Sequence, residues 1–182
     1  ELRVFAEMLV KAGMASLAVH SRIAILQGLS PKQNREIPPL DYPRVYRLKE
    51  QLPGLEIILN GGVRSLEDAA DHLQRVDGVM IGRAAFEDPY ILAEADARMF
   101  SDRHALASRH DIARAMLPYI ERCLSAGSRL NHITRHMLGL FHAQPGARAW
   151  RRYLSENVPL PGAGPETVER ALALVPEDPV RH

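Results

Sequence analysis

The stretches Ile57-Ile58-Leu59-Asn60-Gly61-Gly62 and Val79-Met80-Ile81-Gly82-Arg83-Ala84 decide the fold, because each is a short apolar run that stops at glycine. With a further apolar run upstream, they predict strands over Leu17–His20, Ile57–Asn60 and Gly78–Ile81. Helical patterns separate the three runs. Wholly apolar strands that alternate with helices indicate a parallel sheet covered on both faces.

The helical patterns divide the chain into two parts. The first part contains predicted helices over Leu2–Ala12, from about Pro43, and after an N-cap at Ser65. From about Asp111 the pattern is purely helical, with helices expected near 111–126, 129–142, 146–156 and Glu166–Leu174. We therefore predict an α/β domain over residues 1–108 and an all-α helical bundle with a C-terminal tail over residues 109–182.

The composition is that of an ordinary soluble globular protein, with 182 residues of which 46% are hydrophobic and 25% are charged. No apolar run approaches the roughly 20 residues that span a bilayer, so the sequence predicts a cytoplasmic protein without a membrane partner. The single cysteine, Cys123, excludes an internal disulfide framework. The sequence indicates no protein partner.

The strand ends carry the strongest functional signal. Glycine after a strand lets backbone N–H groups approach an anion closely, and Gly61, Gly62 and Gly82 occupy such positions in consecutive units. In (β/α)₈ barrels the loops after the last two strands commonly bind phosphate, and Arg83 can add charge-assisted hydrogen bonds. The alternative is that these glycines only make tight turns.

His20 ends the first predicted strand, on the edge where barrel enzymes place groups that contact ligands. We interpret it as a hydrogen-bond donor to a ligand, with a structural role as the alternative. The long polar loop that follows, from Ser21 to Tyr42, is of the kind that usually serves function. Within it, Lys32 and Arg35 are candidates for contact with phosphate or a base edge, unless they are ordinary surface charges.

Residues 109–157 contain eight basic residues, all arginine, against three acidic residues. Arg148, Arg151 and Arg152 share one face of the helix expected near 146–156, opposite Trp150. This net charge of +5 favours a polyanion partner, and the alternative is a solvated surface.

His132 and His136 lie four residues apart, which suits metal binding on a helix. The position after His132 is Ile133 rather than an acidic residue, so we expect no metal site.

Several motifs resemble the A-type branch of the tRNA-dihydrouridine synthases. These are Val19-His20-Ser21-Arg22, Leu26-Gln27-Gly28-Leu29-Ser30-Pro31-Lys32, Asn34 through Tyr42, Asn60-Gly61-Gly62, Gly78 through Ala84, and His136-Met137-Leu138-Gly139-Leu140-Phe141. The resemblance covers nearly the whole chain up to Pro159. It implies that the first part is the last three strands of a TIM (β/α)₈ barrel and that the helical domain binds tRNA.

The resemblance also implies the cofactor and the reaction. FMN would be held with its phosphate at Asn60, Gly61, Gly62, Gly82 and Arg83, with His20 contacting the flavin. NADPH would reduce the flavin, and the reduced flavin would give hydride to a uracil flipped out of the tRNA D-loop. Lys32, Arg35, Arg148 and Arg151 would contact the tRNA.

In this family a cysteine acid lies in the N-terminal half of the barrel, whereas Cys123 falls in a predicted helix of the second domain. We therefore assign no catalytic residue to this chain, expect the cysteine upstream, and expect a C-terminal fragment that is inactive alone. Two rivals remain open. One is another FMN barrel acting on a free pyrimidine, and the other is a non-catalytic RNA-binding remnant.

Overall fold

The structure, a computed structural model, describes residues 1–100, 102 and 104–177. The chain divides into two compact units, residues 1–84 and 85–182. The domain boundary predicted between residues 108 and 109 falls inside the second unit, and it stays a prediction.

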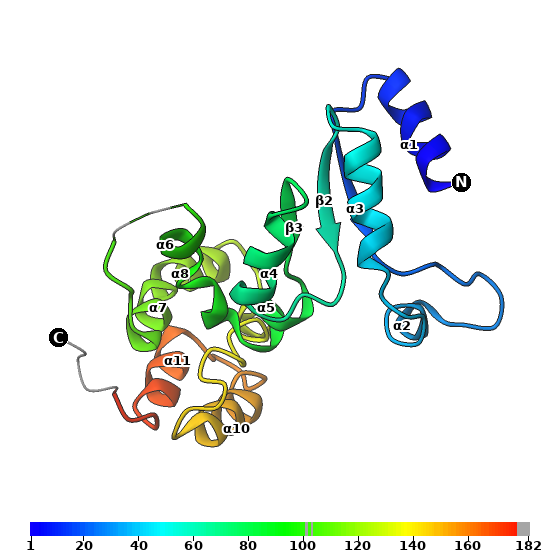
Figure 1. The fold of residues 1–182 in the computed structure, drawn as a ribbon. Helices are drawn as coiled ribbons and strands as arrows, with labels where there is room; N and C mark the ends of the chain where they lie inside the picture. Colours follow the sequence, from blue (N-terminus) through cyan, green and yellow to red (C-terminus); the bar gives the residue numbers. More distant parts are fainter. Residues whose placement is uncertain (101, 103, 178–182) are drawn as a thin grey trace. The chain divides into compact units, whose positions relative to one another are not determined.

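The first unit alternates helices with strands (Figure 1). In chain order it contains α1 (Leu2–Lys11), β1 (Ser16–His20), α2 (Pro31–Asn34), α3 (Tyr42–Gln51), β2 (Glu56–Asn60), α4 (Leu66–Leu73) and β3 (Gly78–Met80). The division between the units falls within the short helix α5 (Arg83–Glu87).

The three strands form a parallel sheet in the order β1-β2-β3, as the sequence predicted. The register pairs His20 with Asn60 and Asn60 with Met80, so the carboxyl ends of the strands lie at one edge. β3 ends at Met80, one residue before the predicted end at Ile81. The fold class at this level is α/β.

One face of the sheet carries most of the unit's core. Ile57 and Leu59 of β2 are fully buried, and α3, which contacts β2, buries Val45 and Leu48. Figure 1 shows α3 running alongside β2. The alternation follows from the period of two in a strand, which sends successive side chains to opposite faces.

The opposite face differs from the sequence prediction of cover on both sides. Ala18 and Met80 are exposed on it, and Ile58 between them is half-buried. Within the described residues, therefore, only one face of the sheet is covered. An apolar strand sequence shows that both faces avoid water, but it does not show which part of a protein covers each face.

Local hydrogen bonds set the ends of the elements. The Ser65 hydroxyl accepts a hydrogen bond from the Asp68 N–H at 3.0 Å, which confirms the predicted N-cap of α4. At the start of β2, the Asp77 carboxylate accepts from the Ile57 N–H at 2.8 Å and lies 2.8 Å from Lys49 Nζ. Burial opposes ionisation of Asp77, but the hydrogen bonds from Ile57 and Lys49 outweigh it and lower the Asp77 pKa.

Within the described residues, the regular secondary structure of the second unit consists of helices alone. It contains η1 (Pro89–Leu92), α6 (Ala95–Met99), α7 (Arg109–Ala115), α8 (Leu117–Ser125), α9 (Leu130–Thr134), α10 (Ala147–Asn157) and α11 (Pro165–Leu172).

Trp150 lies at the centre of this unit's core. Its side chain is fully buried, its ring packs edge-on against Phe141 at 5.0 Å, and its indole N–H donates to the Met137 carbonyl at 3.1 Å. Leu154, one helical turn later, is also buried. This confirms the predicted apolar side of α10, which packs its large aromatic ring with its polar atom satisfied.

Two of the predicted helices are interrupted. The helix expected over 111–126 breaks at Met116, because Pro118 lacks an N–H and its ring disfavours helical backbone before it. In the helix expected over 129–142, α9 ends at Thr134, and the chain continues in turns bonded three residues back, such as Leu140 N–H to Met137 carbonyl. There an added Cβ at Gly139 would lie 2.1 Å from the Glu87 carbonyl oxygen, so only glycine fits.

Among the residues that the structure describes, no helix combines the length and the apolar character needed to cross a membrane.

Candidate functional site

The carboxyl ends of β1 and β2 are joined by hydrogen bonds that continue beyond the strands. The Ser21 N–H donates to the Asn60 carbonyl at 2.8 Å, and the Ser21 hydroxyl donates to the same oxygen at 3.1 Å. Ser21 is buried although it is polar. These bonds fix His20 and Asn60 side by side at the edge of the sheet.

Gly61 and Gly62 require glycine for two separate reasons. Their φ angles of +111° and +80° lie in the region that L side chains rarely adopt. An added Cβ at Gly61 would lie 3.1 Å from the His20 ring, and one at Gly62 would lie 2.6 Å from the Tyr42 hydroxyl. That hydroxyl donates to the Gly61 carbonyl at 3.1 Å. The turn after β2 is therefore closely packed by its neighbours.

His20 is held as a neutral imidazole with its proton on Nε2. The backbone N–H of Arg22 donates to His20 Nδ1 at 3.2 Å, which makes Nδ1 the acceptor. Burial lowers the pKa of His20, and the nearby charges of Arg22, Arg83 and Arg35 lower it further. His20 Nε2 is thus a hydrogen-bond donor at neutral pH.

Gly82 differs from the other two glycines. Its φ lies outside the left-handed region, and a Cβ added there would meet no heavy atom within 4 Å. Nothing within the chain demands glycine at this position. The open space beside the backbone is what the close approach of a ligand requires.

Arg83 follows Gly82 and reaches the polar loop between β1 and α3. Its Nη1 lies 3.7 Å from Glu36 Oε1, and its Nη2 donates to the Arg35 carbonyl at 3.4 Å. Both Arg83 and Glu36 are about half exposed, so this ion pair is weak and can exchange for a stronger anion. The sequence did not predict Glu36 as a partner.

The polar loop is anchored at both ends. The Asp41 N–H donates to the Ser21 carbonyl at 2.7 Å, and Arg22 Nε donates to the Pro38 carbonyl at 2.7 Å. In the middle, the Asn34 amide accepts from the Ile25 N–H at 2.7 Å and donates to the Ile25 carbonyl at 2.8 Å. Hydrogen bonds within the chain therefore define the conformation of the loop without a ligand.

These anchors hold the loop that carries Arg35 and Lys32, two residues predicted to contact RNA. Arg35 follows α2 directly and lies close enough to His20 to lower its pKa, whereas Lys32 is exposed on α2 itself. The capping box between Ser30 and Gln33 fixes the start of α2 within the loop.

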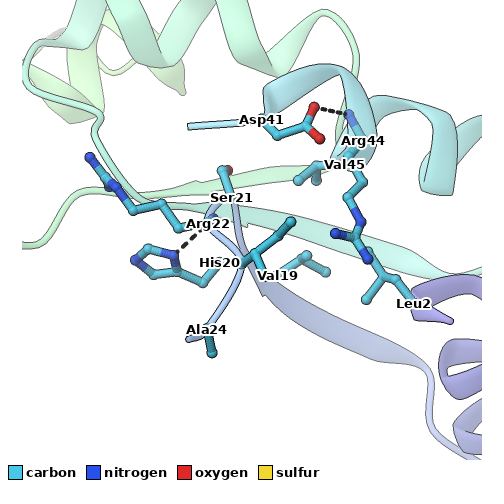
Figure 2. Close-up of a pocket in the computed structure, with 10 residues that line it drawn as sticks. Leu2, Val19, His20, Ser21, Arg22, Ala24, Asp41, Arg44 and Val45 are labelled. Atoms are coloured by element: carbon cyan, nitrogen blue, oxygen red, sulfur yellow. Dashed lines mark hydrogen bonds between the residues drawn. The ribbon is translucent and has the colours of Figure 1, made fainter. Parts of the chain in front are cut away.

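A small cavity of about 190 Å³ lies at the end of β1 (Figure 2). Figure 2 shows Val19, Val45 and Leu2 forming an apolar wall, while His20 and Arg22 extend from the strand end. Its volume is below the roughly 300–1,000 Å³ typical of cofactor pockets. The cavity is therefore too small to enclose a cofactor by itself.

Arg22 is a candidate ligand-binding residue that the sequence analysis did not single out. Its Nη1 atom is buried and has no hydrogen-bond partner in the part of the chain that the structure describes. Buried polar atoms normally have a hydrogen-bond partner, so this atom is suited to bind a ligand. The signal was an arginine two residues after His20, at the point where the strand enters the loop.

The second unit carries the other predicted RNA contacts. Arg148, Arg151 and Arg152 are exposed on α10, on the side opposite the buried Trp150, so the predicted cationic face is confirmed. Cys123 lies on α8, half-buried against the helical core. Among the described residues, no group of three or more His, Cys, Asp or Glu side chains is placed to bind a metal ion.

Comparison with known proteins places these features in a family. Residues 1–174 match the family model described as dihydrouridine synthase (Dus). A tRNA-dihydrouridine(20/20a) synthase of Vibrio cholerae is 57% identical over 166 residues, which cover 91% of this chain and 51% of the relative. The proteins of the same description from Shewanella oneidensis and Escherichia coli K12 are 55% and 58% identical, covering 96% and 86% of this chain and 52% and 46% of the relatives.

The chain thus spans about half the length of the curated relatives that it matches. The family model covers nearly all of the chain, including the strand ends, the polar loop and the helical unit through α11. The chain belongs to the dihydrouridine synthase family.

Proposed function

We propose that this chain forms part of a flavin-dependent enzyme that reduces the C5–C6 double bond of uridine in the tRNA D-loop, giving dihydrouridine. FMN is the proposed cofactor and NADPH the proposed reductant. The names of the relatives support the substrate class, because each describes a tRNA-dihydrouridine synthase.

We further propose that the sheet is the last three strands of a (β/α)₈ barrel. The parallel order β1-β2-β3 with intervening helices supports this assignment. The exposed face that carries Ala18 and Met80 would then face the barrel interior, where side chains fill the core in such folds.

The observation that carries the proposal is the gathering of glycines and arginines at one edge of the sheet. Gly82 leaves open space beside its backbone, and Gly61 and Gly62 turn the chain beside it. Arg83 is paired only weakly with Glu36. The FMN phosphate would be held by Gly82, Arg83, Gly61, Gly62 and Asn60, where backbone N–H groups and a guanidinium suit a dianion.

His20 would orient the flavin. Its neutral imidazole offers Nε2–H as a donor, and the hydrogen bond from the Arg22 N–H fixes the ring in that tautomer. Reduced FMN, when bound, supplies the hydride for uracil C6. The three arginines that lower the His20 pKa also make this edge of the sheet attractive to anions.

The tRNA contacts are proposed for both units. Arg35 and Lys32 lie on the anchored loop that follows His20. Arg148 and Arg151 lie on the exposed face of α10. The guanidinium groups of Arg35, Arg148 and Arg151 suit forked contacts with RNA phosphates, and the Lys32 ammonium suits a single charged contact. Together these residues would hold the nucleotides around the flipped uridine.

Cys123 is not proposed as the acid that protonates uracil C5. It lies among helices of the second unit, beside the helical core and far in sequence from the strand ends. We propose that this proton comes from a residue outside the chain described here.

The function is tested with the protein expressed from its complete reading frame. Incubation with FMN, NADPH and an unmodified tRNA transcript should yield dihydrouridine, measured by mass spectrometry of the digested tRNA.

Replacement of Arg83 by Ala should weaken FMN binding by roughly tenfold or more, since it removes a charge-assisted bond. Arg47→Ala on the exposed side of α3 is the matched control. Absence of dihydrouridine at saturating FMN would contradict the proposal.

A further inference from the structure

A second cavity, of about 370 Å³, lies wholly within the second unit, among α7, α8, α9 and the turns after α9. Its volume is within the range of small-molecule sites. The floor is apolar, because Ile133, Met137 and Leu140 belong to the buried helical core. None of these residues was assigned a role in flavin or phosphate binding.

The mouth of the cavity is formed by rings. Tyr119 of α8 is 46% exposed, and His132 and His136 are exposed on one side of α9 and the turn that follows it. The side-chain interaction with the Cys123 thiol raises the pKa of Tyr119 above its ordinary value. Flat rings therefore surround an apolar floor.

Two exposed arginines contact these rings. The Arg122 guanidinium lies 5.9 Å from the centroid of the Tyr119 ring, and Arg135 Nε donates to His136 Nε2 at 3.0 Å. Neither arginine forms a salt bridge within residues 1–100, 102 and 104–177. Both are therefore available to an anionic group that reaches the mouth of the cavity.

The same contacts disfavour a metal ion. The lone pair of His136 Nε2 is already used as the acceptor for Arg135, and the described residues offer no third ligand. An apolar peptide side chain would fit the floor but would make no use of the arginines at the mouth. A flat, uncharged ring linked to phosphates matches floor, rings and charges together.

We propose that this cavity binds an unstacked nucleobase of tRNA, with the base against Tyr119 and its flanking phosphates near Arg122 and Arg135. This inference rests on the proposed function, in which the protein binds tRNA. We propose a base other than the uridine to be reduced, because none of the residues proposed to hold the flavin lines this cavity. The helical unit would thereby recognise an exposed base in addition to the tRNA backbone.

The test uses the protein from its complete reading frame and an unmodified tRNA transcript. Tyr119→Ala should weaken tRNA binding by roughly fivefold to a hundredfold, the loss expected when a base no longer stacks on a ring. Tyr119→Phe keeps the ring and should bind within about twofold of the wild type on the same reasoning. Phe100→Ala, which removes a ring that is 78% exposed and outside the cavity, is the matched control and should also leave the affinity unchanged.

The dependence of affinity on salt separates a base contact from a phosphate contact. Because Tyr119→Ala removes no phosphate contact, its log–log salt slope should equal that of the wild type. Transcripts that each carry one abasic nucleotide should reveal a position whose loss weakens binding to the wild type but not to Tyr119→Ala. His132→Ala gives an independent test from another wall of the cavity if Tyr119→Ala does not fold.

Wild-type tRNA affinity in both the Tyr119→Ala and His132→Ala variants would overturn the base-binding proposal. So would a lowered melting temperature with unchanged tRNA affinity, because the cavity would then be a structural contact. If those variants bind tRNA with wild-type affinity and still form dihydrouridine, the base-binding proposal fails and the proposed function stands. If the wild type itself makes no dihydrouridine, the proposed function fails instead.

Discussion

Replacement of Gly82 by Ala separates a phosphate site from an ordinary turn. A Cβ at this position meets no heavy atom within 4 Å, and the backbone φ is one that alanine adopts without strain. The substitution should therefore leave stability unchanged or raise it by about 0.4–1 kcal/mol through the lower entropy of the unfolded chain. If the FMN phosphate lies against this backbone, the added methyl group occupies its place.

The expected loss follows from the bonds that the phosphate would forfeit. A charge-assisted hydrogen bond contributes about 1.5–3 kcal/mol, so the FMN dissociation constant should rise by roughly tenfold to a hundredfold. Calorimetric titration of the complete gene product with FMN measures this change. Riboflavin, which lacks the phosphate, should bind to the wild type and to Gly82→Ala with the same affinity.

Gly54→Ala supplies a matched control, because a Cβ there also meets open space and the glycine lies in the turn before β2, at the opposite end of the strand from Gly61. It should share any gain in stability and leave FMN affinity unchanged. Equal FMN affinity in the wild type, Gly54→Ala and Gly82→Ala would refute the placement of the phosphate beside Gly82.

Three further predictions concern the tRNA face, the helical core and the response to acid. Replacing both Arg148 and Arg151 by Ala should raise the tRNA dissociation constant, keep FMN content intact, and make the log–log salt slope shallower by roughly 0.7–0.9 per lost contact; an unchanged slope would show a merely solvated face. Trp150→Ala should lower the free energy of unfolding by about 3–5 kcal/mol, measured by urea titration against Arg152→Ala, which should stay within about 0.5 kcal/mol. Because the folded protein depresses the pKa of Asp77, its contribution to stability is present above the ordinary carboxyl pKa and is lost as pH falls through the lowered value; Asp77→Asn should therefore flatten the fall in melting temperature below about pH 4.

The sequence was most informative where local pattern and tertiary structure agree. The apolar runs that end at His20, Asn60 and Ile81 predicted three parallel strands, since buried strands and their glycine turns are specified by neighbouring residues. The core side of α10 followed from the helical spacing of Trp150 and Leu154. These features depend on periodicity, which a single sequence displays.

Features that depend on long-range contacts were not accessible in the same way. The pairing of Arg83 with Glu36 joins residues 47 positions apart, and no local pattern indicates it. The role of Gly139 became clear only when Glu87 was found against it. The break at Met116 is a different case, because Pro118 signals it locally, and the helical periodicity on both sides obscured that signal.

Reaction of the reduced, FMN-loaded protein with tRNA in the absence of oxygen tests most directly whether this chain serves an enzyme that reduces uridine within tRNA. An unmodified tRNA transcript should oxidise the flavin, followed by its absorbance, and should gain one dihydrouridine for each flavin oxidised, whereas free uridine should react far more slowly. This difference is expected because the arginines of the loop and of α10 would hold the tRNA phosphates around the flipped base. Rapid oxidation by a free pyrimidine with no reaction toward tRNA, or no reaction with either, would contradict the account.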